Sequence, residues 1–168
     1  AAISEHEDRI IKDTDGELYL PVSAVYGPNG GGKTNVLEAL HSLVTKVLRP
    51  LYATSNSEET AMKMKKVVIE PFAFDEATRN EPTEFEVFFR TELAEYRYIL
   101  HVKREIVVYE CLDRVKLETG RRSALFERNT EETILKGVFA KLKISDELSG
   151  TLPLLSYLGI TYKKNEVV

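Results

Sequence analysis

A glycine-rich stretch at residues 27–34 most constrains what this chain can fold into. Its letters, Gly-Pro-Asn-Gly-Gly-Gly-Lys-Thr, match the phosphate-binding loop pattern G-x-x-x-x-G-K-S/T. An apolar, strand-like run at residues 18–26 precedes the loop. Apolar residues at spacings of three and four follow it, and they are Val36, Leu37, Leu40, Leu43, Val44, Val47 and Leu48. A strand, a glycine loop and a helix in this order form the context in which the pattern binds phosphate.

The residue types in this loop predict how a nucleotide is held. Glycines allow successive backbone N–H groups to turn inward around a phosphate chain, and the helix start adds its positive end. Lys33 would reach the β- and γ-phosphates, and the Thr34 hydroxyl would bind Mg²⁺. We expect Gly30 and Gly31, which the pattern leaves free, to supply positive φ angles. The expected ligands are therefore ATP or GTP with Mg²⁺, and the expected binding residues are Gly27, Asn29, Gly30, Gly31, Gly32, Lys33, Thr34 and Asn35.

Composition places the chain among globular domains. Its 168 residues are 43% hydrophobic and 30% charged, which suits one domain with a real core. A net charge of −4 gives no electrostatic case for nucleic acid as a partner of the whole domain. Cys111 is the only cysteine and lies in a strand-like run, so we expect a buried structural thiol. The absence of a membrane-length apolar run and of signal-peptide character at the N-terminus predicts a cytoplasmic location.

The patterning predicts an α/β (α+β) lobe in three parts: a loop unit at 1–50, an antiparallel β-subdomain at 60–128 and a helical part at 129–168. Pro50 is expected to end the first helix at Arg49, because proline disfavours helix in the residue before it. Alternating apolar residues predict four strands in a meander with short hairpins, at 83–90, 94–103, 105–117 and 123–128. Helical spacing returns at 130–143, and a short helix is expected within 152–160, ending at Gly159.

Other candidate sites in the sequence are weak. Asp75, after the apolar residues 72–74, resembles the acidic residue that holds Mg²⁺ in P-loop enzymes, but Pro71 argues against a central strand there. Residues 148–150, Leu-Ser-Gly, resemble the start of an ABC signature, lack its second glycine and are interpreted as a loop. His6, His41 and His101 lack metal-site spacing. The lysines at 63, 65 and 66 are interpreted as a solvated face.

Two blocks of residues resemble a known family. Residues 25–40, Val-Tyr-Gly-Pro-Asn-Gly-Gly-Gly-Lys-Thr-Asn-Val-Leu-Glu-Ala-Leu, look like the loop and helix of ABC-like ATPases. The second block contains Pro71-Phe72, residues 79–86, Tyr96-Arg97-Tyr98 and residues 125–128, Leu-Phe-Glu-Arg. Together they are similar to AAA-type ATPases of the overcoming-lysogenization-defect and abortive-infection group, which are related to RecF and the chromosome-maintenance ATPases.

This resemblance implies more than the residues themselves show. It implies that the chain is the N-terminal lobe of a longer ATPase, whose Walker B strand, signature motif and preceding strand lie elsewhere. It also implies ATP held between two protomers, with a nuclease or DNA as further partners, in DNA repair or anti-phage defence. The chain contains no glutamine, so the lid glutamine usual in ABC-type ATPases has no counterpart here.

Three functions remain open at the level of sequence. The favoured one is an ATP-binding lobe that hydrolyses poorly by itself because the Walker B and signature motifs are absent. The second is a complete small P-loop kinase or GTPase that uses Asp75, although the sequence lacks the N/T-K-x-D motif of GTPases. The third is an interaction domain whose glycine loop no longer binds a nucleotide.

Overall fold

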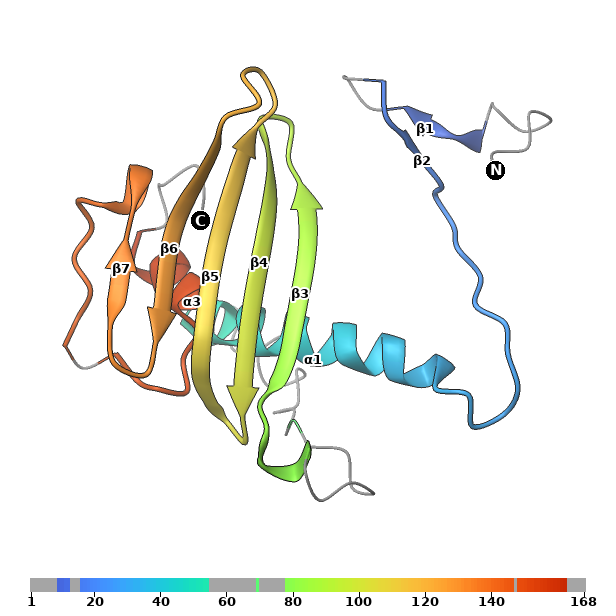
Figure 1. The fold of residues 1–168 in the computed structure, drawn as a ribbon, viewed down its shortest axis with the longest axis horizontal. Helices are drawn as coiled ribbons and strands as arrows, with labels where there is room; N and C mark the ends of the chain where they lie inside the picture. Colours follow the sequence, from blue (N-terminus) through green and yellow to red (C-terminus); the bar gives the residue numbers. More distant parts are fainter. Residues whose placement is uncertain (1–8, 13–15, 55–68, 70–77, 147, 163–168) are drawn as a thin grey trace. The chain divides into compact units, whose positions relative to one another are not determined.

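The computed structural model of the chain describes residues 9–12, 16–54, 69, 78–146 and 148–162. The chain divides into two compact units, residues 1–38 and 39–168. In the first unit, the short strands β1 (Ile11–Lys12) and β2 (Leu18–Tyr19) pair antiparallel. The glycine loop follows, and helix α1 (Lys33–Thr54) begins at the loop lysine (Figure 1).

The strand expected at residues 18–26 forms only at Leu18–Tyr19, and the prediction is wrong for residues 20–26. A strand exists through its ladder with a neighbour, and within the described residues β2 pairs only with Ile11–Lys12. Alternating apolar residues indicate that a segment can form a strand, but they do not show whether a neighbouring strand is present to pair with it. The apolar side chains after β2 are exposed: Leu20, Val22, Val25 and Tyr26.

Helix α1 continues through Pro50 to Thr54, so the predicted end at Arg49 is wrong. Proline removes the i→i−4 hydrogen bond to the carbonyl of residue 46 and crowds that preceding turn, yet only one turn of helix follows it. The Thr54 hydroxyl donates to the carbonyls of Pro50 and Leu51 at 3.3 and 3.0 Å, which supports that turn. Of the predicted apolar face of α1, only Leu43 and Val47 are buried.

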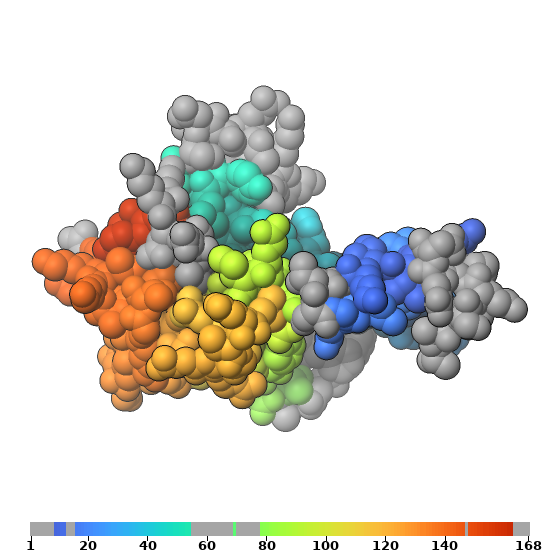
Figure 2. All heavy atoms as spheres, turned by 90° about the horizontal axis from the view of Figure 1, so that it is seen from above, coloured from blue at the N-terminus to red at the C-terminus, as the bar shows by residue number. Residues whose placement is uncertain are grey.

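The antiparallel meander is confirmed, and it forms a five-stranded sheet in the order β3-β4-β5-β6-β7. Its strands are β3 (Thr83–Arg90), β4 (Ala94–Lys103), β5 (Ile106–Lys116), β6 (Arg122–Asn129) and β7 (Thr133–Leu135). The first four lie within one residue of the predicted bounds. The β3–β4 and β5–β6 turns lie at the same end of the sheet, where the Leu117 N–H donates to the Leu93 carbonyl at 3.1 Å. Figure 2 shows this end from above, with the gold β5–β6 turn beside the green of β3 and β4.

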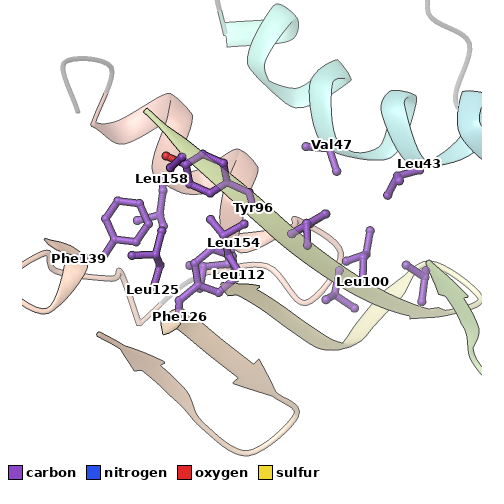
Figure 3. Close-up of a cluster of buried hydrophobic side chains, with 14 residues drawn as sticks. Leu43, Val47, Tyr96, Leu100, Leu112, Leu125, Phe126, Phe139, Leu154 and Leu158 are labelled. Carbon is purple, nitrogen blue, oxygen red and sulfur yellow. The ribbon is translucent and has the colours of Figure 1, made fainter. Parts of the chain in front are cut away.

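One face of the sheet carries the core. Strand β4 alternates strictly, and its inward side chains are Tyr96, Tyr98, Leu100 and Val102, all buried. This confirms that the strand aromatics at 96 and 98 are core residues. Figure 3 shows Leu43 and Val47 pointing from α1 toward the sheet near Leu100. The second helix on this face is α3, whose residues Leu154 and Leu158 are fully buried.

The helix predicted at 130–143 is wrong, because strand β7 and the 3₁₀ turn η3 (Gly137–Phe139) occupy this segment. The Asn129 side chain accepts hydrogen bonds from the N–H groups of Glu131 and Glu132 at 2.8 and 2.9 Å. This turn sends the chain back along β6, because asparagine side chains bond to the backbone two or three residues on. Gly137 then has a φ of +55°, which ends the strand and buries Phe139 against Phe126.

The final predicted helix is confirmed as α3 (Leu154–Thr161), which continues past Gly159 to Thr161. The preceding residues 148–150 form a loop, as predicted, in which the Gly150 carbonyl accepts a hydrogen bond from the Val107 N–H at 2.9 Å. Strand β5 and α3 are therefore linked through this loop as well as through the core.

Candidate nucleotide-binding loop

The glycine loop is folded by its own backbone. Gly30 and Gly32 have φ angles of +79° and +78°, a left-handed conformation that strongly favours glycine. The Gly31 N–H donates to the Pro28 carbonyl at 3.1 Å, and the Asn35 N–H donates to the Gly32 carbonyl at 3.0 Å. These bonds turn the chain tightly before α1 begins.

The predicted positive φ is correct for Gly30 and wrong for Gly31. At Gly31 crowding favours glycine instead, because a Cβ atom on it would lie 3.1 Å from the Pro28 carbonyl oxygen. The three consecutive glycines therefore have two different roles. Two of them allow the left-handed turns, and the middle one allows the backbone to fold onto itself.

Lys33 is the first residue of α1 and folds back over the loop. Its Nζ donates to the carbonyl oxygens of Gly27 and Pro28 at 2.7 and 2.6 Å. An ammonium group has three N–H donors, so these two bonds leave one for an incoming anion. The lysine charge is thus held above the loop by loop carbonyls rather than extended away from it.

The remaining predicted binding residues lie around the start of α1. Thr34 is the exposed second residue of the helix, and the Asn35 amide nitrogen lies 3.9 Å from where a Cβ atom on Gly32 would be. Asn29 is exposed within the loop. The first N–H groups of a helix have no acceptor within it and point outward from its start. This combination of outward N–H groups, an ammonium and a hydroxyl fits the donor set that a nucleotide phosphate chain with Mg²⁺ requires.

The other sequence candidates that the structure describes do not form a second site. His41 is exposed on α1, and His101 lies on β4 with its Nδ1 3.7 Å from a Glu84 carboxylate oxygen. Cys111 is buried, as predicted, and burial raises the pKa of its thiol, which disfavours the reactive thiolate. Among the described residues, no three histidine, cysteine, aspartate or glutamate side chains are grouped as metal ligands. Asp75, His6 and the lysines at 63, 65 and 66 lie outside the described residues.

The loop that opens helix α1 and the mixed α/β architecture define a P-loop NTPase fold. A family model described as "AAA domain, putative AbiEii toxin, Type IV TA system" matches residues 22–159, which include the loop, α1, the sheet and most of α3. The chain belongs to this family and is a nucleotide-binding domain of a P-loop, AAA-type ATPase. Among curated proteins and solved structures, none matches the chain.

In the part of the chain that the structure describes, no helix is both long enough and apolar enough to span a membrane.

Sequence reasoning missed one charged cluster. Glu110 lies on β5 at a position that faces the core, beside Tyr98 of β4 and Arg128 of β6. The sequence did contain a clue to this cluster. Glu110 precedes Leu112 by two residues, so in a strand both side chains lie on the same face, which the alternating pattern predicts to be the core face.

Proposed function

We propose that the loop binds the phosphates of ATP through Gly27, Asn29, Gly30, Gly31, Gly32, Lys33, Thr34 and Asn35. The observation that carries this proposal is the Lys33 ammonium, held above a left-handed glycine turn at the start of a 22-residue helix. A cation fixed in this place would contact the β- and γ-phosphates, while the N–H groups at the helix start would donate hydrogen bonds to phosphate oxygens.

Thr34 is the residue that would hold Mg²⁺, because its hydroxyl lies one residue beyond the lysine at the helix start. The bound ion would neutralise phosphate charge. Lys33 and the loop backbone would orient the nucleotide, and the glycines would exclude side chains from the phosphate path.

Hydrolysis needs more than this binding loop. A P-loop ATPase also uses a carboxylate that holds Mg²⁺ and a group that orients the attacking water. We propose that these come from Walker B and signature motifs that this sequence does not contain. The 168-residue chain would then bind Mg-ATP and turn it over slowly.

We further propose that the chain belongs to the ABC-like group that contains the overcoming-lysogenization-defect and RecF-related ATPases. The two sequence blocks at 25–40 and 71–128 support this assignment, and the family description, which names an AbiEii toxin, is compatible with it. In this proposal the full protein forms a homodimer through bound ATP and acts in the cytoplasm in anti-phage defence or DNA repair. A nuclease or DNA would be its further partner.

Mg-ATP is expected to raise the thermal unfolding temperature of the chain. A ligand that binds only the folded state at 100 times its Kd stabilises that state by about 2.7 kcal/mol. Differential scanning fluorimetry with and without millimolar Mg-ATP measures this effect. An unchanged melting temperature would favour the interaction domain with a silent loop.

Gly32→Ala is expected to weaken nucleotide binding by about 5- to 30-fold, because the strain of a non-glycine residue at positive φ, roughly 1–2 kcal/mol, distorts the loop. Gly120→Ala is the matched control. Gly120 also has a positive φ of +61°, in the β5–β6 turn, and a Cβ atom on it would meet no other atom within 4 Å. Both variants should lose similar stability, and only Gly32→Ala should lose affinity in a nucleotide titration. Equal affinities for the two variants would contradict the assignment.

A further inference from the structure

The carboxylate of Glu110 lies inside the core and holds the start of α3. The side chain is fully buried, and its two oxygens accept hydrogen bonds from the backbone N–H groups of Leu154 and Leu155 at 2.6 and 2.9 Å. The Tyr98 hydroxyl donates a third bond at 2.8 Å. Burial raises the pKa of Glu110, and these three bonds oppose the rise because they stabilise the carboxylate.

Arg128 fixes the loop that leads into α3. Its guanidinium donates to the carbonyls of Leu152 and Ser149 at 2.8 and 3.3 Å and lies 3.9 Å from the Glu110 carboxylate. The negative carboxylate of Glu110 on β5 therefore contacts the N–H groups at the start of α3. The positive guanidinium of Arg128 on β6 contacts the carbonyl groups of the loop before that helix. Both charges act on one short segment, residues 149–155.

The residue that follows this segment is bonded to α1 in the turn before Pro50. The Ser156 hydroxyl, fully buried, donates to the Val47 carbonyl at 2.7 Å. Val47 lies in the turn that leads to Pro50, where α1 loses one of its i→i−4 bonds. Figure 3 shows Val47 of α1 and Leu154 and Leu158 of α3 on the same side of the sheet.

We propose that Glu110 and Ser156 are positioning residues that couple the docking of α3 to the conformation of α1, and through α1 to nucleotide binding. The nucleotide part of this inference rests on the proposed function, because Lys33 begins the same helix. Coupling of this kind is reciprocal: whatever stabilises docked α3 strengthens nucleotide binding, and bound nucleotide stabilises docked α3.

The α3 segment is suited to two discrete states. An isolated helix of eight residues is unstable in water, so α3 forms only when it is docked. Its docking depends on Leu154 and Leu158 in the core and on the polar bonds of Glu110 and Ser156. Loss of those bonds opens one local unit, while the ladder of the sheet can remain intact.

Hydrogen–deuterium exchange of the whole 168-residue chain tests the inference first without nucleotide. Glu110→Gln and Ser156→Ala should each speed exchange in peptides from α3 and from residues 43–54 by about tenfold, the opening expected for a lost buried hydrogen bond. Exchange in strand β3, which pairs with β4 alone among the described strands, should stay unchanged. The matched controls are Glu127→Gln, on the neighbouring strand, and Thr119→Ala, whose hydroxyl accepts a bond from the Arg121 N–H in the β5–β6 turn. If the two variants loosen α3 and leave residues 43–54 unchanged, the link between α3 and α1 is wrong.

The second arm adds a non-hydrolysable ATP analogue with Mg²⁺, with binding verified by calorimetry. Bound analogue should slow exchange of the Leu154 and Leu155 amides in the wild type, and Ser156→Ala should abolish that slowing while still binding the analogue. Binding without any change at α3 would overturn the nucleotide coupling. Failure of the wild type to bind at all would refute the proposed function and, with it, the nucleotide coupling. The nucleotide-free arm would still decide the α3–α1 link.

Discussion

Glu110→Ala lowers the unfolding free energy of the chain by about 3–5 kcal/mol, the loss typical of removing one partner from a buried charged network. Alanine leaves the N–H groups of Leu154 and Leu155 without their acceptor in the core. It also removes the charge that faces Arg128, which is itself nearly buried. The free-energy penalty for leaving such groups buried without a partner is larger than the net contribution of their hydrogen bonds to stability.

Urea unfolding at neutral pH, followed by circular dichroism, measures this loss. Glu127→Ala is the control, because Glu127 lies on the opposite face of the sheet, half exposed, with Tyr109 and Lys136 as partners. Its loss should stay below about 1 kcal/mol, as for other solvent-screened pairs. If the two alanine variants were equally stable, Glu110 would not anchor α3.

Lys33→Ala weakens binding of Mg-ATP by about 2 kcal/mol or more, or roughly 30-fold, because it removes a charge-assisted contact with the phosphates. The same change removes the two bonds that hold the lysine above the Gly27 and Pro28 carbonyls. Lys46→Ala is a matched control on the same helix. Its ammonium also donates to a backbone carbonyl, that of Glu105 at 2.8 Å, in the β4–β5 turn.

The sheet could be predicted closely from the sequence because two independent signals agreed. Side chains alternated with period two along β4, and the linkers at residues 91–93 and 104–105 were short enough only for hairpins. A strand that is buried on one face allows a single register, since a slip by one residue would turn its apolar side chains to solvent. The first four strands of the sheet were therefore specified almost to the residue.

The prediction for the segment after β6 was wrong because the spacing of its apolar residues fits both a helix and a short strand. Ile134, Leu135, Val138 and Phe139 satisfy a helical pattern, and Ile134 and Leu135 also suit a short strand. The turn at Asn129 and the positive φ of Gly137 decided between them. A side-chain hydrogen bond to the backbone or a single glycine changes the chain direction at one or two residues. A periodicity that is read over a long segment does not detect such features.

The position of the glycine loop could be predicted from its motif, whereas the backbone geometry inside the loop could not. Spacing alone made Gly27, Lys33 and Thr34 candidate binding residues, whereas the crowding at Gly31 depends on a carbonyl three residues earlier. The network around Glu110 was missed for a related reason. Its partners come from β4, β6 and α3, and only the folded sheet brings these elements together.

Isothermal titration of a non-hydrolysable ATP analogue with Mg²⁺ tests the central claim most directly, on wild type, Lys33→Ala and Lys46→Ala. The account predicts binding by wild type and Lys46→Ala with similar Kd, and a loss of roughly 30-fold or more for Lys33→Ala. Wild-type binding that Lys33→Ala leaves unchanged would show that the nucleotide lies elsewhere. Absence of binding by all three proteins would contradict the claim that this loop holds ATP in this chain.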